Sequence, residues 1–229
     1  MDIDPLNDAK IVESWSVNAR PWVAAVRDGQ IESRRQVTDA AIVNAVLSYS
    51  PRTVLDIGCG EGWLARELAA RNIHAIGIDA IPQLVDAARQ AGGGDFHVVS
   101  YEEIAAKDFG VSIDAVVCNF SLLGKESVEV VLSAVPSLMN TAGVLIVQTL
   151  HPVTACGDLP YRDGWREGSW AGFGPDFSNP APWYFRTLGR WTQLLRDHGF
   201  RLLEVREPIH PKTQKPASVI FVAESRAND

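Results

Sequence analysis

The chain has few cysteines, and it lacks both long apolar runs and an excess of positive charge. Its three cysteines, Cys59, Cys118 and Cys156, form no CxxC pair, which argues against a disulfide framework or a cysteine-rich zinc site and favours a reducing compartment. No apolar segment approaches the roughly 20 residues that span a membrane, and the acidic start MDIDPLNDAK lacks the apolar core of a signal peptide. The net charge of -7 disfavours a general electrostatic grip on nucleic acid. We therefore expect a cytoplasmic protein with no membrane span and no nucleic-acid partner.

The chain does contain short apolar runs that alternate with helical patterns. Its 229 residues are 46% hydrophobic, which is enough for one sizeable core. The strand candidates are almost wholly apolar, as in a parallel sheet covered on both faces; they are Thr53–Ile57, Ala75–Ile78, Phe96–Val99, Ala115–Cys118 and Val144–Thr149, followed by Arg201–Arg206 and Ser218–Ala223. Helices are predicted over Gly62–Arg71, Ile81–Gln90, Glu126–Met139 and Thr187–His198, with a break or kink at Pro136. The alternation predicts an α/β fold with a doubly wound, Rossmann-like, mostly parallel seven-stranded sheet, helices on both faces and an antiparallel last strand.

Two regions fall outside this alternation. Residues 1–50 carry an apolar stripe at helical spacing and are expected to form a helical cap on the sheet. Residues 151–186 are rich in Gly, Pro and aromatics, and a long irregular stretch of this kind is typical of a lid or binding loop. We expect a single domain over 1–229, with the core at 51–150, the lid at 151–186, and a helix with a strand pair at 187–229.

The stretch VLDIGCGEGW, residues 54–63, places three glycines at the turn between a strand and a helix. Gly58, Gly60 and Gly62 give GxGxG rather than the GxGxxG of dinucleotide sites, and no lysine follows as in a phosphate-binding loop. Asp56 and Glu61 flank the turn, and their charges would repel a pyrophosphate but attract a cationic ligand. The same stretch therefore favours a positively charged nucleoside over NAD.

Asp79 provides a second indication, because it lies just beyond the end of the second predicted strand. A carboxylate at this position accepts hydrogen bonds from a ribose diol, in sites for NAD and for S-adenosylmethionine (SAM) alike. Asp79 therefore indicates a nucleoside without saying which.

With both features in place, residues 54–89 resemble the class I SAM-dependent methyltransferases. The resemblance is strongest to the small-molecule group that includes ubiquinone-biosynthesis and related bacterial enzymes, and it covers residues 35–150 well. It implies a SAM site that releases S-adenosylhomocysteine. The implied contacts run from the methionyl part to the adenine and the sulfonium, and they involve Asp56, Gly58, Cys59, Gly60, Asp79, Ala80, Ile81, Ser100, Tyr101, Asn119 and Phe120.

The chain departs from the family pattern at two places. Ser100 and Tyr101 stand where relatives carry an acidic residue and an adenine neighbour, so the Ser100 hydroxyl or the Tyr101 backbone would have to bind the adenine amino group. Leu122 or Leu123 stands where many relatives carry histidine, so a base from that position is absent.

Candidates for the remaining roles come from the two outer regions. Arg34, Arg35 or Arg20 could bind the SAM carboxylate, and Trp15 and Trp22 could cover the cofactor.

The segment between Tyr161 and Trp191 contains nine of the chain's 19 aromatic residues (7 Trp, 4 Tyr and 8 Phe), which favours a lid over a flat or apolar small molecule. His151 and His210 each follow a predicted strand and could act as a base, and Tyr184, Tyr161 and Arg186 are further candidates near the acceptor. No cluster of residues suggests a metal site.

The predicted activity is transfer of a methyl group from SAM to a small aromatic or apolar acceptor, with O-methylation ahead of C- or N-methylation and the protein a monomer or homodimer. Two alternatives remain at this point: a nicotinamide dehydrogenase, and a SAM-binding protein without catalysis. A nucleic-acid methyltransferase is weaker, because CNFS replaces an NPPY-like tetrad after the fourth strand.

Overall fold

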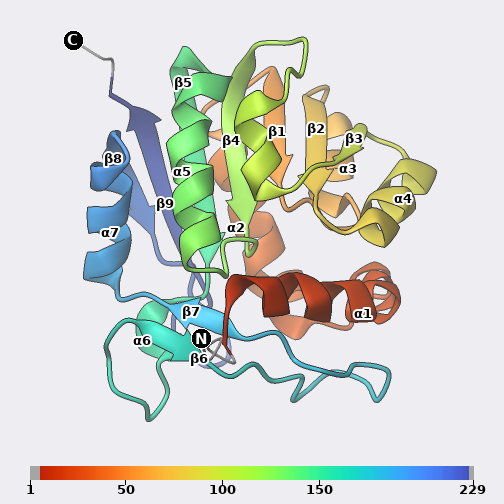
Figure 1. The fold of residues 1–229 in the computed structure, drawn as a ribbon, viewed down its shortest axis with the longest axis vertical. Helices are drawn as coiled ribbons and strands as arrows, with labels where there is room; N and C mark the ends of the chain where they lie inside the picture. The colour runs from red at the N-terminus through yellow and green to blue at the C-terminus, as the bar shows by residue number, and fades with distance from the viewer. Residues whose placement is uncertain (1–5, 227–229) are drawn as a thin grey trace, which may run out of the picture.

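A seven-stranded sheet forms the centre of the molecule (Figure 1). The computed structural model describes residues 6–226, and the strand order is β3-β2-β1-β4-β5-β9-β8. β9 runs antiparallel to both of its neighbours, whereas the pairs among β1 to β5 are parallel. The bounds are β1 Thr53–Ile57, β2 His74–Asp79, β3 Asp95–Val98, β4 Ile113–Asn119, β5 Met139–Thr149, β8 Phe200–Arg206 and β9 Val219–Ser225. The predicted fold class is confirmed.

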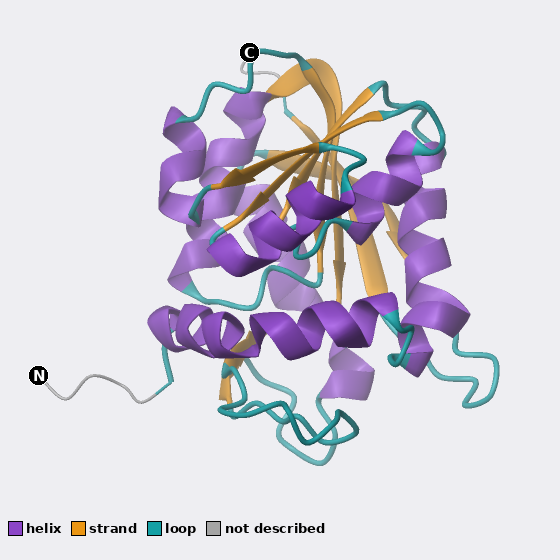
Figure 2. Ribbon diagram, turned by 90° about the vertical axis from the view of Figure 1, so that its right-hand side faces the viewer, coloured by secondary structure: helices purple, strands orange, loops and turns teal. Residues whose placement is uncertain are grey.

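Helices cover both faces of this sheet (Figure 2), because the strands bury apolar side chains on both sides. α5 (Glu126–Leu138), α7 (Leu188–Asp197) and the 3₁₀ turn η2 (Tyr101–Ala106) pack on one face. α2 (Asp39–Leu47), α3 (Trp63–Ala69) and α4 (Pro82–Ala91) pack on the other. Successive strand residues alternate between these layers, so Leu55 and Ile57 face α5 while Asp56 between them faces the α2 side.

A long N-terminal helix, α1 (Asp8–Arg27), lies across the carboxyl ends of the parallel strands (Figures 1 and 2). Its first residue fixes it to the core, because the Asp8 carboxylate accepts hydrogen bonds from the amides of Lys125 (2.8 Å) and Ser127 (2.6 Å) at the start of α5. α5 has no side-chain cap of its own, so Asp8 supplies the acceptor and negative charge that a helix start favours. The predicted helical cap therefore spans the edge of the sheet where ligands bind in doubly wound folds.

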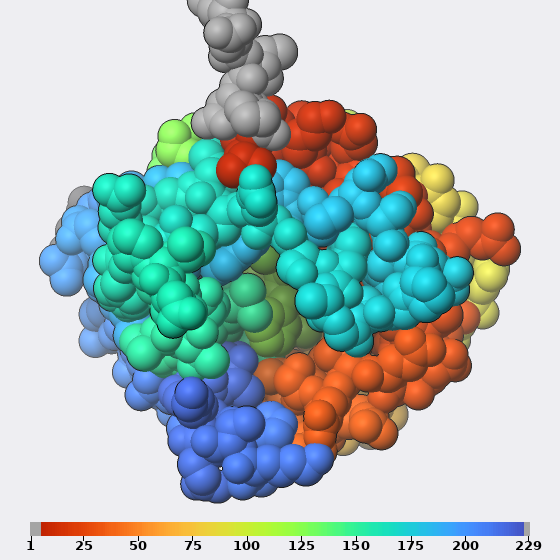
Figure 3. Space-filling view, turned by 90° about the horizontal axis from the view of Figure 1, so that it is seen from below, coloured from red at the N-terminus to blue at the C-terminus, as the bar shows by residue number. Residues whose placement is uncertain are grey.

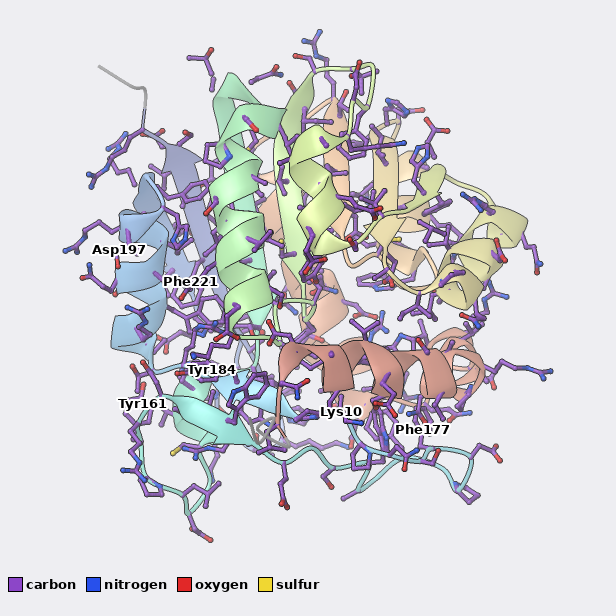
Figure 4. All side chains as sticks on the ribbon, in the orientation of Figure 1. Lys10, Tyr161, Phe177, Tyr184, Asp197 and Phe221 are labelled. Carbon is purple, nitrogen blue, oxygen red and sulfur yellow. The ribbon has the colours of Figure 1, made fainter. Side chains whose placement is uncertain are left out.

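Residues 151–186 follow β5, and the loop that carries the labelled Phe177 lies beyond α1, on its side away from the sheet (Figure 4). The expectation of an irregular stretch is wrong in part. This segment contains a short helix, α6 (Pro152–Ala155), and a two-stranded antiparallel sheet of β6 (Gly164–Arg166) and β7 (Trp183–Phe185). Strands of three residues are too short to show periodicity, and their pairing spans 19 residues of sequence between Trp165 and Tyr184.

Three smaller differences concern helix ends and turns. A π-helical turn, η1 (Arg34–Thr38), precedes α2 directly. α5 continues through Pro136 and ends two residues later. β5 begins at Met139, five residues before the predicted start, across an irregularity in its pairing with β4.

Candidate active site

The glycine turn between β1 and α3 uses its backbone amides internally. The amides of Gly58 and Cys59 both donate to the Ile78 carbonyl, at 2.8 and 2.9 Å. The amide of Gly60 donates to Asp79 Oδ2 at 2.9 Å, and that of Gly62 donates to the Cys59 carbonyl at 3.1 Å. A phosphate cradle needs amides that point at the ligand, and these four already have acceptors. The turn is therefore poorly suited to a pyrophosphate.

Two buried carboxylates stand at this turn. Asp79 also accepts from the Ile81 amide at 2.9 Å. This fixes its carboxylate beside the open side of the glycine turn, which faces α1 and is called the mouth below. Burial raises the pKa of Asp79 to about 6, against the opposing effect of the amides of Ile81, Gly60 and Ala80. Burial, together with a smaller contribution from the charge of Asp79, raises the pKa of Asp56 to about 7. Asp56 Oδ1 has no hydrogen-bond partner among the described residues. A cationic ligand would relieve both charges.

Glu61, the other acidic residue of the turn, has a different role from the one predicted. Its side chain is fully buried, and it accepts from Arg66 Nη2 at 2.6 Å and from Arg27 Nε at 2.9 Å. These two cations compensate its charge, so Glu61 does not contribute to the negative potential that a ligand in the turn would meet. The argument that Glu61 repels a pyrophosphate is therefore wrong, and the preference for a cation depends on Asp56 and Asp79. Arg27 belongs to α1, so this triad also ties the N-terminal helix to the glycine turn.

The three glycines of the turn meet different surroundings. A Cβ on Gly58 would overlap the Ser121 side chain, and one on Gly62 would clash with Phe96 and Ala88. Close packing alone therefore requires glycine at both positions. A Cβ on Gly60 would meet only Trp22 Nε1, at 3.7 Å, so Gly60 faces the α1 side of the mouth. The Cys59 side chain is buried against Gly77 of β2 rather than directed at this mouth.

The ends of β3 and β4 bring four more of the predicted residues to the same rim. Ser100 caps η2 together with Glu103, so its hydroxyl is already engaged. Tyr101 Oη donates to the Ser121 carbonyl at 3.0 Å and would lie 3.3 Å from a Cβ on Gly58, so the phenol bridges the mouth, and burial raises its pKa. Asn119 ends β4, and Phe120 follows it with a φ of +54°. That left-handed conformation is strained for a side chain of this size, and such strain clusters at functional sites.

The three candidate arginines have different surroundings, although Arg34 and Arg35 are neighbours in η1. Arg34 stands in η1, donates from Nε to Asp39 at 3.0 Å, and stacks over Trp63 at 4.6 Å from the ring centroid. Trp63 begins α3 directly after the glycine turn, so Arg34 lies close to the mouth but is already paired. Arg35 packs near Gly29, and Arg20 is exposed on α1.

α1 and the 151–186 segment are joined above the mouth by a cluster of aromatic rings. We call this cluster the aromatic cover; its members are Trp15, Trp22, Trp170, Phe173 and Phe177. The centroids of neighbouring rings lie 4.8 to 6.3 Å apart. Asn18, fully buried on α1, donates to the Ser178 carbonyl at 2.7 Å and accepts from the Ser178 amide at 2.9 Å. Because Trp22 also faces Gly60, this cover lies directly over the glycine turn. Sequence reasoning named both tryptophans of α1 but missed Asn18, whose partner is 160 residues away.

The two candidate histidines differ in their surroundings. His151 follows β5 and is buried, and its Nε2 lies 2.7 Å from Glu207 Oε1. Its Nδ1 has no hydrogen-bond partner among residues 6–226. His210 lies in a turn after β8, where its Nδ1 accepts from the amides of Lys212 and Thr213 at 3.2 and 3.4 Å. Nothing in the sequence pairs His151 with Glu207, since 56 residues separate them.

Tyr184 and Arg186 lie at β7, beside the start of α5. Arg186 is buried, and its guanidinium donates to the carbonyls of Gly124 (2.7 Å) and Lys125 (2.9 Å). Burial lowers the pKa of Arg186 to about 10. The Tyr184 ring lies 4.8 Å from this guanidinium, and its amide donates to the Leu123 carbonyl at 2.8 Å. This arrangement fastens β7 to the loop between β4 and α5. Tyr161 lies nearby, where its Oη accepts from the Leu188 amide at 3.0 Å.

The molecule is hollowed on this side (Figure 3). The view along the carboxyl ends shows a depression with a green floor, in the colour of the middle of the chain. Its walls are the cyan 151–186 segment, the orange region that contains η1 and α2, and the blue region around residues 207–218.

These features fit SAM. A buried carboxylate oxygen without a partner, a second carboxylate held by the turn, and amides that are not free to bind phosphate all favour a cationic nucleoside. Among the described residues no group of three or more His, Cys, Asp or Glu is placed to hold a metal ion. In residues 6–226 no helix has the length and apolar character needed to cross a membrane.

Comparison with known proteins agrees with this assignment. A family model described as a methyltransferase domain matches residues 32–205. A ubiquinone biosynthesis O-methyltransferase of Xanthomonas oryzae is 34% identical over 118 residues, covering 49% of this chain and 49% of the relative. The chain thus matches about half the length of that curated relative.

Two solved structures share the fold. The magnesium protoporphyrin IX methyltransferase of Synechocystis, with bound S-adenosylhomocysteine, gives a TM-score of 0.66 at 20% identity, covering 96% of this chain and all of that one (100%). The 1,6-didemethyltoxoflavin N1-methyltransferase of Burkholderia thailandensis gives 0.65 at 16% identity, covering 98% and 93%. The nicotinamide alternative is thereby set aside, because this chain belongs to the methyltransferase-domain family.

Proposed function

We propose that the protein methylates a hydroxyl group on a small, flat aromatic acceptor, with His151 as the base. The observation that carries this proposal is the pairing of His151 with Glu207. An ionised carboxylate only accepts hydrogen bonds, so in the neutral imidazole Nε2 carries the proton and Nδ1 keeps a free lone pair. A buried, oriented imidazole with an unused lone pair is suited to general base catalysis.

The chemistry requires a base because a hydroxyl is a weak nucleophile until its proton leaves. SAM supplies a methyl group bonded to a positively charged sulfur. His151 Nδ1 takes the proton of the acceptor hydroxyl as the oxygen bonds the methyl carbon, and S-adenosylhomocysteine is the second product. Glu207 holds the imidazole ring and stabilises the imidazolium that forms. The rest of catalysis comes from holding donor and acceptor in line.

The aromatic cover supports the nature of the acceptor. Its rings present flat apolar surface next to Gly60, and stacking against such rings favours a planar molecule. Asn18 and Ser178 hold the cover closed through two hydrogen bonds. We propose that the 151–186 segment acts as the lid over this acceptor, and that the chain forms one domain.

We also propose a cytoplasmic location, with the protein a monomer or homodimer. All three cysteines are free and buried, which suits a reducing compartment.

The test uses labelled SAM with a panel of phenols and catechols, each paired with its methyl ether. We expect label in the phenols only, and we expect His151→Asn to lower kcat about 100-fold or more while leaving the dissociation constant of SAM unchanged. His210→Asn is the matched control, since that imidazole lies in an exposed turn, and it should keep its kcat. An unchanged kcat for His151→Asn would remove His151 as the base, and label in amines but not phenols would overturn O-methylation.

A further inference from the structure

Three buried polar side chains near the carboxyl end of β5 have atoms without a hydrogen-bond partner. Thr38, Gln148 and Ser218 are 2%, 1% and 0% exposed. Thr38 Oγ1, Gln148 Oε1 and Ser218 Oγ make no hydrogen bond within the described part of the chain. Buried polar atoms in folded proteins are nearly always paired, so three such atoms in one region require an explanation.

The three side chains share one face of the sheet. Gln148 pairs in register with Ile220, which packs in the α2 layer. Ser218 lies two residues before Ile220 and so points to the same face. Thr38 ends η1 and begins the approach to α2, and Gln148 Nε2 donates to its carbonyl at 3.1 Å. The segments that carry these residues also border the hollow of Figure 3, where the orange and blue walls meet the green floor.

The chemistry of the set is defined by the Gln148 amide. A backbone carbonyl only accepts hydrogen bonds, so Nε2 must face Thr38 and the amide orientation is fixed. Gln148 Oε1 is left as a pure acceptor. The hydroxyls of Thr38 and Ser218 can each donate or accept. A group that presents an N–H beside a C=O would satisfy all three atoms.

The π-helical turn explains how Thr38 reaches this place. η1 replaces one turn of an otherwise α-helical stretch, and π turns inside helices are frequent at functional sites. The turn is unfavourable by itself, and it places Thr38 where its carbonyl accepts from Gln148 of β5.

We infer that Thr38, Gln148 and Ser218 form a polar subsite that binds an amide-like edge, a planar N–H with an adjacent C=O, on the methyl acceptor. Gln148 Oε1 accepts from the N–H, and the Thr38 and Ser218 hydroxyls donate to the C=O. This inference rests on the proposed function, because it takes the occupant of the subsite to be the methyl acceptor. The subsite determines which flat molecules bind and in which orientation, while His151 acts on the hydroxyl at another position of the same molecule.

The test measures binding without turnover. The protein is saturated with S-adenosylhomocysteine and titrated with benzamide, which carries an N–H beside a C=O, and with N,N-dimethylbenzamide, which lacks the N–H; ligand NMR reports both. We expect benzamide to bind at least about fivefold more tightly than its dimethyl analogue, the difference typical of one hydrogen bond.

Two variants remove the unpaired hydroxyls with almost no change in shape. Thr38→Val and Ser218→Ala should each weaken benzamide binding about fivefold to tenfold. Neither should alter the affinity for S-adenosylhomocysteine or lower the Tm, because each removed hydroxyl has no partner in the folded protein. Ser133→Ala, on the exposed side of α5, is the matched control and should leave binding unchanged.

Equal binding of the two benzamides, or no binding of either, would overturn the subsite. A lower Tm in both variants with unchanged benzamide binding would show that the hydroxyls serve the fold. The outcome is independent of His151, so failure of the base in the kinetic test and failure of the subsite in the binding test are distinguishable.

Discussion

Replacing Asp56 by asparagine should make the protein more stable and a poorer binder of SAM. Asp56 is 2% exposed, and its Oδ1 lacks a partner in residues 6–226. Burial, with a smaller contribution from the charge of Asp79, raises its pKa from 3.8 to about 7. A shift of about three pKa units corresponds to about 4 kcal/mol between the two protonation states. Relaxation and water entry reduce that ceiling, so we expect about 2 kcal/mol.

The pH dependence of this effect follows from its direction. Below about pH 3 the carboxyl is largely protonated in the folded and the unfolded chain, and asparagine is then a close substitute. Between pH 4 and pH 7 the folded chain binds more protons than the unfolded chain, so wild-type stability falls as the pH rises. Above pH 7 the loss is complete. Asp56→Asn avoids it, so the difference between variant and wild type should be near zero at pH 4 and largest at pH 8.

Urea unfolding at pH 4.5 and pH 8 measures this difference, and calorimetry with SAM measures the cost to binding. A charged hydrogen bond contributes about 1.5–3 kcal/mol, so SAM should bind about 10- to 100-fold more weakly to the variant. A variant that is no more stable than wild type at pH 8 would refute the idea that an ionised Asp56 is held at the cost of stability. Unchanged SAM affinity would show that the ligand does not contact it.

Three further substitutions test other parts of the site. Gly60→Val places a branched side chain at a φ of +57° facing Trp22, and it should abolish SAM binding in calorimetry; Gly110→Val, at a φ of +68° in open space, carries similar strain and should bind normally. Glu61→Gln removes the anion that Arg27 and Arg66 share and should cost about 1–3 kcal/mol in urea unfolding, because both arginines are partly exposed; a loss of SAM affinity with unchanged stability would instead show that Glu61 contacts the ligand. Arg186→Met leaves the carbonyls of Gly124 and Lys125 unpaired and should lower stability by about 1–3 kcal/mol, so a Tm equal to wild type would contradict its fastening role.

The sheet was predictable because its evidence is local. β1 matches the predicted strand residue for residue, since an apolar run ended by a glycine turn needs no distant partner to define it. α3, α4 and α5 fall within two residues of their predicted ends for the same reason. The position of Asp79 at the end of β2 also follows from strand length alone.

What the sequence did not reveal depends on contacts between distant segments. Glu61 looked like a ligand-facing charge until Arg27, 34 residues earlier, was seen to pair with it. The pairing of His151 with Glu207 and that of Asn18 with Ser178 have no signature in either partner's neighbourhood. The π-helical turn has none either, because its residues also suit an ordinary helix. Each of these depends on how α1 and the 151–186 segment pack over the sheet.

The aromatic cover also gives the protein an intrinsic optical reporter. Trp15, Trp22 and Trp170 are three of the seven tryptophans. The Trp15 ring lies edge to face with that of Trp22 at 4.9 Å and with that of Trp170 at 5.8 Å, measured between ring centroids. Indole emission shifts with the polarity of its surroundings, so opening or filling the space beside Gly60 should change the spectrum without any added dye. A stopped-flow fluorimeter could then follow ligand entry in real time on the unmodified chain.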